Sequence, residues 1–101
     1  MGWFRRKKKD EATARVDAGI LHLEQFIASR TGVEAYVEPK TAVTDVTLLL
    51  IAHDGEWTRR RVGSAEEAWA FGRKHNLPVY DANVVGYPQR MREWSSRHKK
   101  S

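Results

Sequence analysis

The stretch TDVTLLLIAHDGEWTRRRV, residues 44–62, contains the strongest fold signal in the chain. Residues 44–53 are apolar on both alternating faces, which predicts a strand in the centre of a sheet. One face carries Val46, Leu48 and Leu50, and the other carries Leu49 and Ile51. Asp54-Gly55 is a strong hairpin signal, so residues 56–62 are expected to return as an antiparallel strand.

The length of the hairpin loop decides which side chains share a face, because a shift of one residue moves every side chain to the other face. A three-residue loop places Trp57, Arg59 and Arg61 on one face and leaves only Arg60 toward the helices. A two-residue loop exchanges the two faces. We favour the three-residue loop, since it adds Val62 to the apolar stripe of the central strand.

On the N-terminal side, residues 10–30 are predicted to form a helix whose apolar residues recur at steps of three and four. These residues are Ala12, Val16, Ile20, Leu23 and Ile27. Gly32 is placed for a left-handed C-cap. Residues 33–38 alternate apolar and polar before Pro39, which predicts a strand with one wet face.

On the C-terminal side, Ser64 and Glu67 form a capping-box pattern at the start of a helix that extends to His75. Residues 77–81 are predicted to form a short strand, parallel to an earlier one because the intervening helix favours a right-handed crossover. Residues 82–86 are predicted to be a loop. Pro88 then suits the first turn of a last helix, which packs against the body of the domain.

The sequence therefore predicts an α+β fold with the order α-β-β-β-α-β-α. We expect an antiparallel three-strand meander plus a short fourth strand, with helices mainly on one face. The length of 101 residues suits one domain. The predicted organisation is a basic N-terminal tail at 1–9, a single α+β domain at 10–96 and a basic C-terminal tail at 97–101.

Positive charge is concentrated at the two ends of the chain. Residues 1–9 carry five basic side chains and no acidic one, and residues 90–101 carry five basic side chains and one acidic one. Residues 10–89 hold eight basic and twelve acidic side chains, so the centre is net −4 in a chain of net +5. Basic ends of this kind attract polyanions such as nucleic acid or an anionic membrane. The alternative is that they only keep the protein soluble.

Composition and motif spacing argue against several classes of function. The chain has no cysteine, which excludes disulfides and thiolate metal ligands and suits a reducing compartment. The longest apolar run, residues 46–52, is far shorter than a membrane span, and a cytoplasmic protein is expected. The four histidines lack ligand spacing and no glycine-rich dinucleotide turn is present, so neither a metal nor a cofactor is predicted.

The helix–meander–helix order of residues 10–76 resembles a double-stranded RNA-binding domain. That resemblance implies basic residues at the start of the second helix, which contact phosphates. This chain has Glu66 and Glu67 there, and their charge repels phosphate. This departure argues against RNA binding of that kind, and a similar layout stays open.

With the fourth strand included, residues 10–81 resemble the restriction-endonuclease-like core. The resemblance implies a metal-binding acid early in the second strand, which Asp45 matches, and Glu-x-Lys on the third strand. The third strand has Thr58 and three arginines instead, with Glu56 only at the turn. A metal-dependent nuclease site is not expected, and a nuclease-like fold without catalysis stays open.

Two short sequence segments are similar to segments of short actinobacterial proteins of unknown role, some of which carry an oxidoreductase label. They are DGEWTRRR at residues 54–61 and GYPQRM at residues 86–91. The resemblance covers most of the chain and implies no function, because the sequence has no dinucleotide turn, no cysteine pair and no flavin motif.

These patterns favour a small non-catalytic binding domain that engages a polyanion, in the first place nucleic acid or a ribonucleoprotein. Contact is expected through the basic termini and a face of the sheet that combines tryptophan with arginine. The candidate nucleic-acid-binding residues are Arg5, Arg6, Lys7, Lys8, Lys9, Trp57, Arg59, Arg61, Arg97, Lys99 and Lys100.

Several alternatives remain open at this point. The sheet arginines can instead pair with Glu34 and Glu38 across strands while Trp57 covers apolar surface. The alternative function is a protein–protein interaction module, including a homodimer through the sheet. A divergent nuclease-like fold is third. Binding to an anionic membrane surface is a minor option, because Trp3-Phe4 is too short for stable anchoring.

Overall fold

A four-stranded mixed sheet lies at the centre of the structure, a computed structural model that describes residues 11–99. The strands are β1 (Glu34–Glu38), β2 (Thr47–Ile51), β3 (Trp57–Arg61) and β4 (Val79–Asp81). They lie in the order β3-β2-β1-β4, with β4 parallel to β1 and the other pairs antiparallel. The predicted parallel strand is therefore present as β4.

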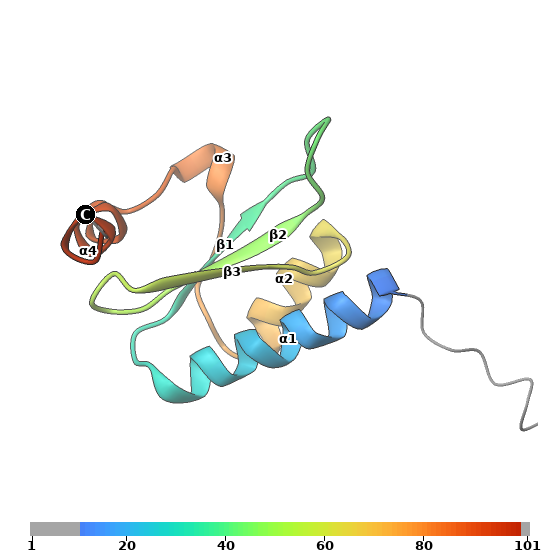
Figure 1. The fold of residues 1–101 in the computed structure, drawn as a ribbon, viewed down its shortest axis with the longest axis horizontal. Helices are drawn as coiled ribbons and strands as arrows, with labels where there is room; N and C mark the ends of the chain where they lie inside the picture. The colour runs from blue at the N-terminus through green and yellow to red at the C-terminus, as the bar shows by residue number, and fades with distance from the viewer. Residues whose placement is uncertain (1–10, 100–101) are drawn as a thin grey trace, which may run out of the picture.

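Two layers of helix lie on opposite sides of this sheet (Figure 1). The longer helices, α1 (Glu11–Ser29) and α2 (Ala65–Lys74), cover one face. The shorter helices, α3 (Ala82–Val85) and α4 (Gln89–Arg97), lie on the other side, and α4 stands beside the β2–β3 turn. The predicted α+β class and element order are confirmed, with one short helix added before the last one.

The hairpin has the register that the three-residue loop predicts. Leu50 pairs with Thr58, and Leu48 pairs with Arg60. The Ala52 amide donates to the Glu56 carbonyl at 2.8 Å, which closes the loop. Residues 48–51 are 0% exposed, so β2 is the buried central strand that its sequence predicts.

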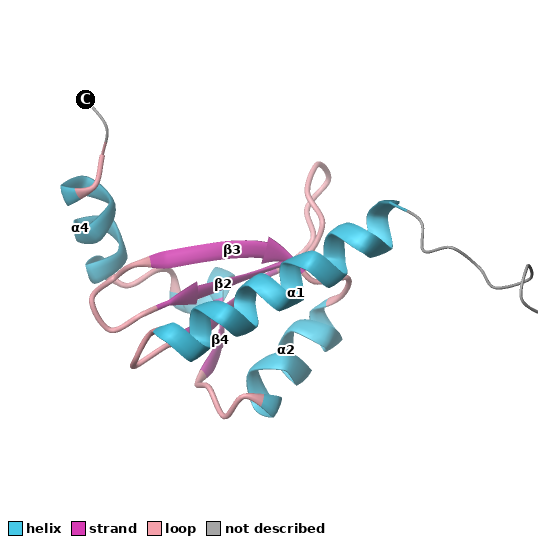
Figure 2. Cartoon of the chain, turned by 60° about the horizontal axis from the view of Figure 1, so that its bottom comes forward, coloured by secondary structure: helices cyan, strands magenta, loops and turns pink. Residues whose placement is uncertain are grey.

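The main core fills the space between the sheet and the two long helices (Figure 2). Leu23 and Phe26 of α1 and Ala68 and Phe71 of α2 pack on the strand residues of this face. Arg60 is the one β3 arginine on the helix side, and Gly19 makes room for it. A Cβ on Gly19 would lie 3.2 Å from the Arg60 Cβ, so the absence of a side chain lets α1 approach the strand.

The ends of the long helices follow their sequence signals. Gly32 has φ of 62°, as the predicted left-handed cap requires. The Ser64 hydroxyl accepts a hydrogen bond from the Glu67 amide at 3.1 Å and begins α2. After α2, Asn76 takes φ of 57°, a conformation that asparagine adopts more readily than most residues, and turns the chain into β4.

A second, smaller core lies on the opposite face of the sheet and corrects two predictions. Tyr36, Leu49, Ile51 and Ala82 are buried there, so the face of β1 that was predicted to be wet is covered. Residues 82–86 were predicted to be a loop, but residues 82–85 form α3. The Asp81 carboxylate accepts from the Asn83 amide at 2.8 Å and caps this single turn.

Candidate polyanion-binding surface

The sheet residues predicted to bind nucleic acid do share one face. Trp57, Arg59 and Arg61 alternate with the helix-facing residues of β3 and lie on the side of the second core. Arg97 and Lys99 lie at the exposed end of α4 and just beyond it. Arg5, Arg6, Lys7, Lys8, Lys9 and Lys100 fall outside the described residues.

Trp57 is engaged with the last helix and is only partly exposed. Its indole Nε1 donates to the Ser95 hydroxyl of α4 at 2.7 Å. The ring packs with Met91 on the second core, and the Arg59 guanidinium lies 5.4 Å from the ring centroid. Trp57 therefore connects β3 to α4, in addition to covering apolar sheet surface.

Arg59 is held by a single carboxylate that three groups share. Its Nε and Nη2 donate to the two oxygens of Glu38 at 2.6 and 2.8 Å. The Thr47 hydroxyl donates to the same carboxylate at 2.6 Å, and the Tyr87 hydroxyl donates to it as well. Burial raises the pKa of Glu38, but these hydrogen bonds outweigh it and leave the pKa below its ordinary value of 4.5.

The cross-strand pairing weighed from the sequence is thus present for Arg59 and Glu38. Glu34 has a different partner, Arg90 of α4, whose Nη2 lies 2.6 Å from the Glu34 Oε1. Arg90 also donates to the Ala52 carbonyl at 3.2 Å, so it fastens the start of α4 to the sheet. Arg61 lies 3.5 Å from Asp45 in an exposed ion pair.

Two basic side chains near the C-terminus, Arg92 on α4 and Lys99 just beyond it, border a shallow groove of about 470 Å³. Its lining residues are Tyr87, Met91, Arg92, Ser95, Ser96 and Lys99. Within the described residues, Arg92, Arg97 and Lys99 have no carboxylate at ion-pairing distance. The groove therefore combines two uncompensated charges, Arg92 and Lys99, with hydroxyl donors and an aromatic ring.

Arg92 was not among the predicted site residues. The signal for it is helical spacing, because residues 92, 95, 96 and 99 recur at steps of three and four and so share one side of a helix.

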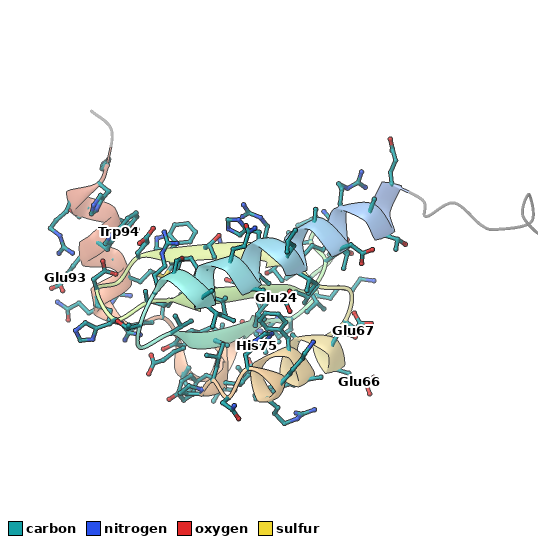
Figure 3. All side chains as sticks on the ribbon, turned by 90° about the horizontal axis from the view of Figure 1, so that it is seen from below. Glu24, Glu66, Glu67, His75, Glu93 and Trp94 are labelled. Atoms are coloured by element: carbon teal, nitrogen blue, oxygen red, sulfur yellow. The ribbon has the colours of Figure 1, made fainter. Side chains whose placement is uncertain are left out.

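The end of α4 is ordered by its own contacts. The His98 ring stacks on Trp94 with centroids 3.9 Å apart, and its Nδ1 lies 2.8 Å from the Trp94 carbonyl oxygen. Trp94 and Glu93 are labelled on α4 in Figure 3.

The nuclease pattern is not assembled by the fold. Asp45 precedes β2 beside Arg61, whereas Glu56 precedes β3 and pairs with Arg30 at 2.5 Å. Because β2 and β3 are antiparallel, these two acids lie at opposite ends of the hairpin. Across residues 11–99 no group of three or more His, Cys, Asp or Glu side chains is arranged to hold a metal ion.

The histidines have separate local partners. His75 at the end of α2 points toward Glu24 of α1, with 3.3 Å between the Nε2 and the Oε2 (Figure 3). The His22 Nε2 lies 2.7 Å from the Thr58 hydroxyl on β3. Both contacts connect helices of the main core to neighbouring elements.

The helices of residues 11–99 are all too short or too polar to cross a lipid bilayer. Comparison of the chain with models of known protein families, with curated proteins and with solved structures found no match.

Proposed function

We propose that this protein is a non-catalytic binding domain for a polyanion, in the first place nucleic acid, and that the α4 groove with the flanking basic tails is its contact surface. The observation that carries the proposal is which basic side chains form ion pairs with carboxylates and which do not. The sheet arginines Arg59 and Arg61 are compensated by carboxylates, whereas Arg92 and Lys99 open onto a groove without one. Uncompensated cations of this kind attract phosphates at no cost in broken ion pairs.

The groove offers more than charge. The Ser96 hydroxyl supplies a neutral donor of the type that contacts phosphate oxygens. Tyr87 lines the groove with an exposed ring, a surface on which an unpaired base stacks. In this arrangement Trp57 and Arg59 act as support, because they hold α4 and the Tyr87 hydroxyl in place through Ser95 and Glu38.

The test is a titration of short labelled single- and double-stranded RNA and DNA by fluorescence anisotropy at about 50 and about 200 mM salt. We expect micromolar binding at low salt that weakens steeply at the higher salt. The variant Arg92→Gln/Lys99→Gln should lower the slope of log Kd against log salt by about 2, one for each lost phosphate contact. Removal of residues 1–9 should weaken binding further.

The matched control is Lys40→Gln/Arg73→Gln, which removes the same charge from exposed positions far from α4 in the sequence. This control should keep the slope of the unaltered protein. An equal loss in both double variants would show a general net-charge attraction and overturn the assignment to α4. Absence of binding at low salt, or binding insensitive to salt, would overturn the proposed function itself.

A second candidate function, contact with another protein, is favoured by an apolar patch on α3. Val84 and Val85 are 79% and 55% exposed, and they adjoin the tyrosine cluster formed by Tyr36, Tyr80 and Tyr87. Sedimentation equilibrium tests the homodimer version of this candidate. A dimer that Val84→Glu/Val85→Glu dissociates would support it, and a monomer at every concentration would contradict it.

A further inference from the structure

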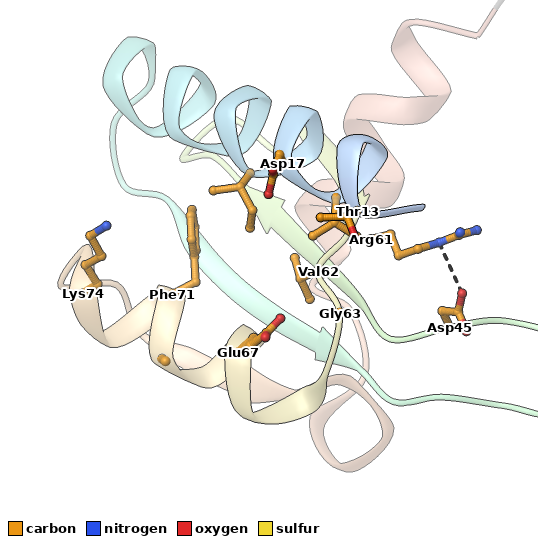
Figure 4. A pocket seen from close by; sticks show the side chains of 12 residues that line it. Thr13, Asp17, Asp45, Arg61, Val62, Gly63, Glu67, Phe71 and Lys74 are labelled. Carbon is orange, nitrogen blue, oxygen red and sulfur yellow. Dashed lines mark ion pairs between the residues drawn. The ribbon is translucent and has the colours of Figure 1, made fainter. Parts of the chain in front are cut away.

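A groove between the start of α1 and α2 lies on the opposite side of the molecule from α4 (Figure 4). It has a volume of about 690 Å³, within the range of ligand sites. Five apolar side chains line it, from α1, from α2 and from the residue that follows β3: Val16, Ile20, Val62, Ala70 and Phe71. The groove therefore leaves apolar surface of the main core open to an occupant.

The rim of the groove carries acidic side chains. Asp17 from α1 and Glu67 from α2 border it, as Figure 4 shows. Glu67 has no ion-pair partner among the described residues. Two basic residues also line the groove. Arg61 is paired with Asp45, whereas Lys74 at the far end of α2 has no carboxylate partner among residues 11–99. An occupant with aromatic side chains for the apolar lining and basic side chains for the acidic rim matches this groove.

We propose that residues 1–9 of the same chain are this occupant, with Trp3 and Phe4 on the apolar lining and the following basic run along the acidic rim. The chain enters at the right place, because the groove is lined by Thr13, Val16 and Asp17 in the first turns of α1. The seven Cα–Cα steps from Phe4 to Glu11 span up to about 24 Å. Ile20 lies only about 14 Å along the helix from Glu11, so the segment reaches the whole lining.

The sequence of the tail favours this occupant over a second copy or a separate peptide. Trp3 and Phe4 are the only aromatic residues before α1, and five consecutive basic residues follow them directly. Because the tail is tethered at the mouth of the groove, its effective concentration there is in the millimolar range that short linkers give. A second copy or a free peptide would have to bind without that advantage.

Docking has a regulatory consequence that rests on the proposed function. The same five cations would serve the acidic rim of the groove or the phosphates of a polyanion, and the two sites lie on opposite sides of the domain. Tail docking would therefore compete with polyanion binding. The apparent affinity for the polyanion falls in proportion to the undocked fraction of the protein.

Paramagnetic relaxation on the full chain tests docking without any polyanion. The chain has no cysteine, so Gly2→Cys gives a single site for a nitroxide label. We expect the amide signals of residues 16–20 and 62–71 to lose most of their intensity, and those of α4 to keep theirs. Trp3→Ala/Phe4→Ala should restore the groove signals. Unchanged groove signals in the labelled protein would overturn the proposal.

Ala70→Arg is the matched test from the groove side. Ala70 is an exposed helix residue on the groove, so an arginine there blocks the lining and repels the tail without removing core atoms. Ala28→Arg is the control, since it adds the same side chain at an exposed position of α1 outside the groove. The first variant should abolish the relaxation effect, and the second should preserve it. Equal effects of the two would contradict docking in this groove.

A mixing experiment distinguishes docking of a chain's own tail from docking of the tail of another copy. Nitroxide-labelled protein without nitrogen-15 is mixed with nitrogen-15 protein that carries no nitroxide. Broadening of the groove signals in this mixture would show exchange between copies and overturn the intramolecular proposal. Trp3→Ala/Phe4→Ala should also raise polyanion affinity by about fivefold to tenfold, the inverse of the undocked fraction. If no polyanion binds, the proposed function fails while the relaxation result still decides docking.

Discussion

At the scale of single residues, Glu38 is the most heavily used polar group of the second face. Its side chain is 14% exposed and accepts hydrogen bonds from Arg59, Thr47 and Tyr87. These donors come from β2, β3 and the segment before α4, so one carboxylate joins three parts of the chain. Hydrogen bonds to a charged group in a mostly buried position contribute more than ordinary ones.

Glu38→Gln should therefore lower the free energy of unfolding at neutral pH by about 2 kcal/mol. Asp45→Asn is the control, because it breaks an exposed Arg–carboxylate pair and should cost about 0.5 kcal/mol or less. Urea denaturation of both variants and the unaltered protein measures the difference. Equal costs for the two substitutions would show that the burial of Glu38 adds nothing.

The lowered pKa of Glu38 gives this stabilisation a pH dependence with a definite sign. A carboxyl group whose pKa is lower in the folded state stabilises the fold fully above its unfolded pKa. The contribution is lost as the pH falls from the ordinary value of 4.5 through the folded pKa. The difference in stability between the unaltered protein and Glu38→Gln should therefore shrink below about pH 4.5. A difference that stays constant into strong acid would contradict it.

At the scale of elements, β4 and α2 approach each other at a glycine. A Cβ on Gly72 would lie 2.1 Å from the Val79 Cγ2, although the helical backbone there suits any residue. Gly72→Ala gains helix propensity but forces this contact apart, with an expected net cost of about 1–2 kcal/mol. Val79→Ala removes the opposing methyl groups and, in the double variant, should restore part of the loss.

A double-mutant cycle measured by denaturation checks this contact. We expect the cost of Gly72→Ala to be smaller when residue 79 is alanine, with a coupling of about 1 kcal/mol. Additive costs would mean that the backbone moves to relieve the clash.

The α4 helix meets the hairpin turn at a second glycine, Gly55. A Cβ there would lie 2.1 Å from the carbonyl oxygen of Arg90 and 3.0 Å from the Trp94 Cβ. Gly86 also has a positive φ, of 72°, but a Cβ there has no atom within 4 Å. Gly55→Ala should therefore destabilise the protein more than Gly86→Ala and should shift the backbone amide signals of α4. Equal effects would indicate that only backbone strain matters at both sites.

Sequence patterns predicted the elements that depend on local periodicity and missed those that depend on distant contacts. The register of residues 46–62 follows from apolar alternation, and the structure has it. A four-residue helix has no periodicity to detect, and its one signal was Asp81 as a cap. The contact between Trp57 and Ser95 joins residues 38 positions apart and leaves no local pattern, so the cover that α4 gives the second face was not predicted.

At the scale of the whole molecule, the buried central strand is uncharged, whereas the charged helix α4 has no buried residue. The central strand β2 is fully buried from residue 48 to 51, whereas α4 contains no buried residue. Yet α4 carries two cations, Arg92 and Arg97, that have no carboxylate partner among residues 11–99. The proposed contact surface is therefore built on a helix without a buried residue, the kind of element that opens locally at low cost.

Native-state hydrogen exchange should show this gradient. The amides of α4 are expected to exchange at least about 30-fold faster than those of β2, a difference of about 2 kcal/mol in opening free energy. The comparison helix is α2, which has ten residues against nine in α4 but buries Ala68, Phe71 and Gly72. It should stay close to β2 in protection. Exchange of α4 only through global unfolding would contradict this expectation.

The same measurement then connects stability to the proposed function. A ligand that binds only the closed form of α4 slows its exchange by a factor of 1 + [L]/Kd, which is about elevenfold at ten times its Kd. Short RNA or DNA at low salt should therefore slow exchange in α4 while leaving α2 unchanged. With Arg92→Gln/Lys99→Gln this protection should be lost. Protection of α2 in place of α4 would move the contact surface to the other side of the molecule and contradict the assignment made from the unpaired cations.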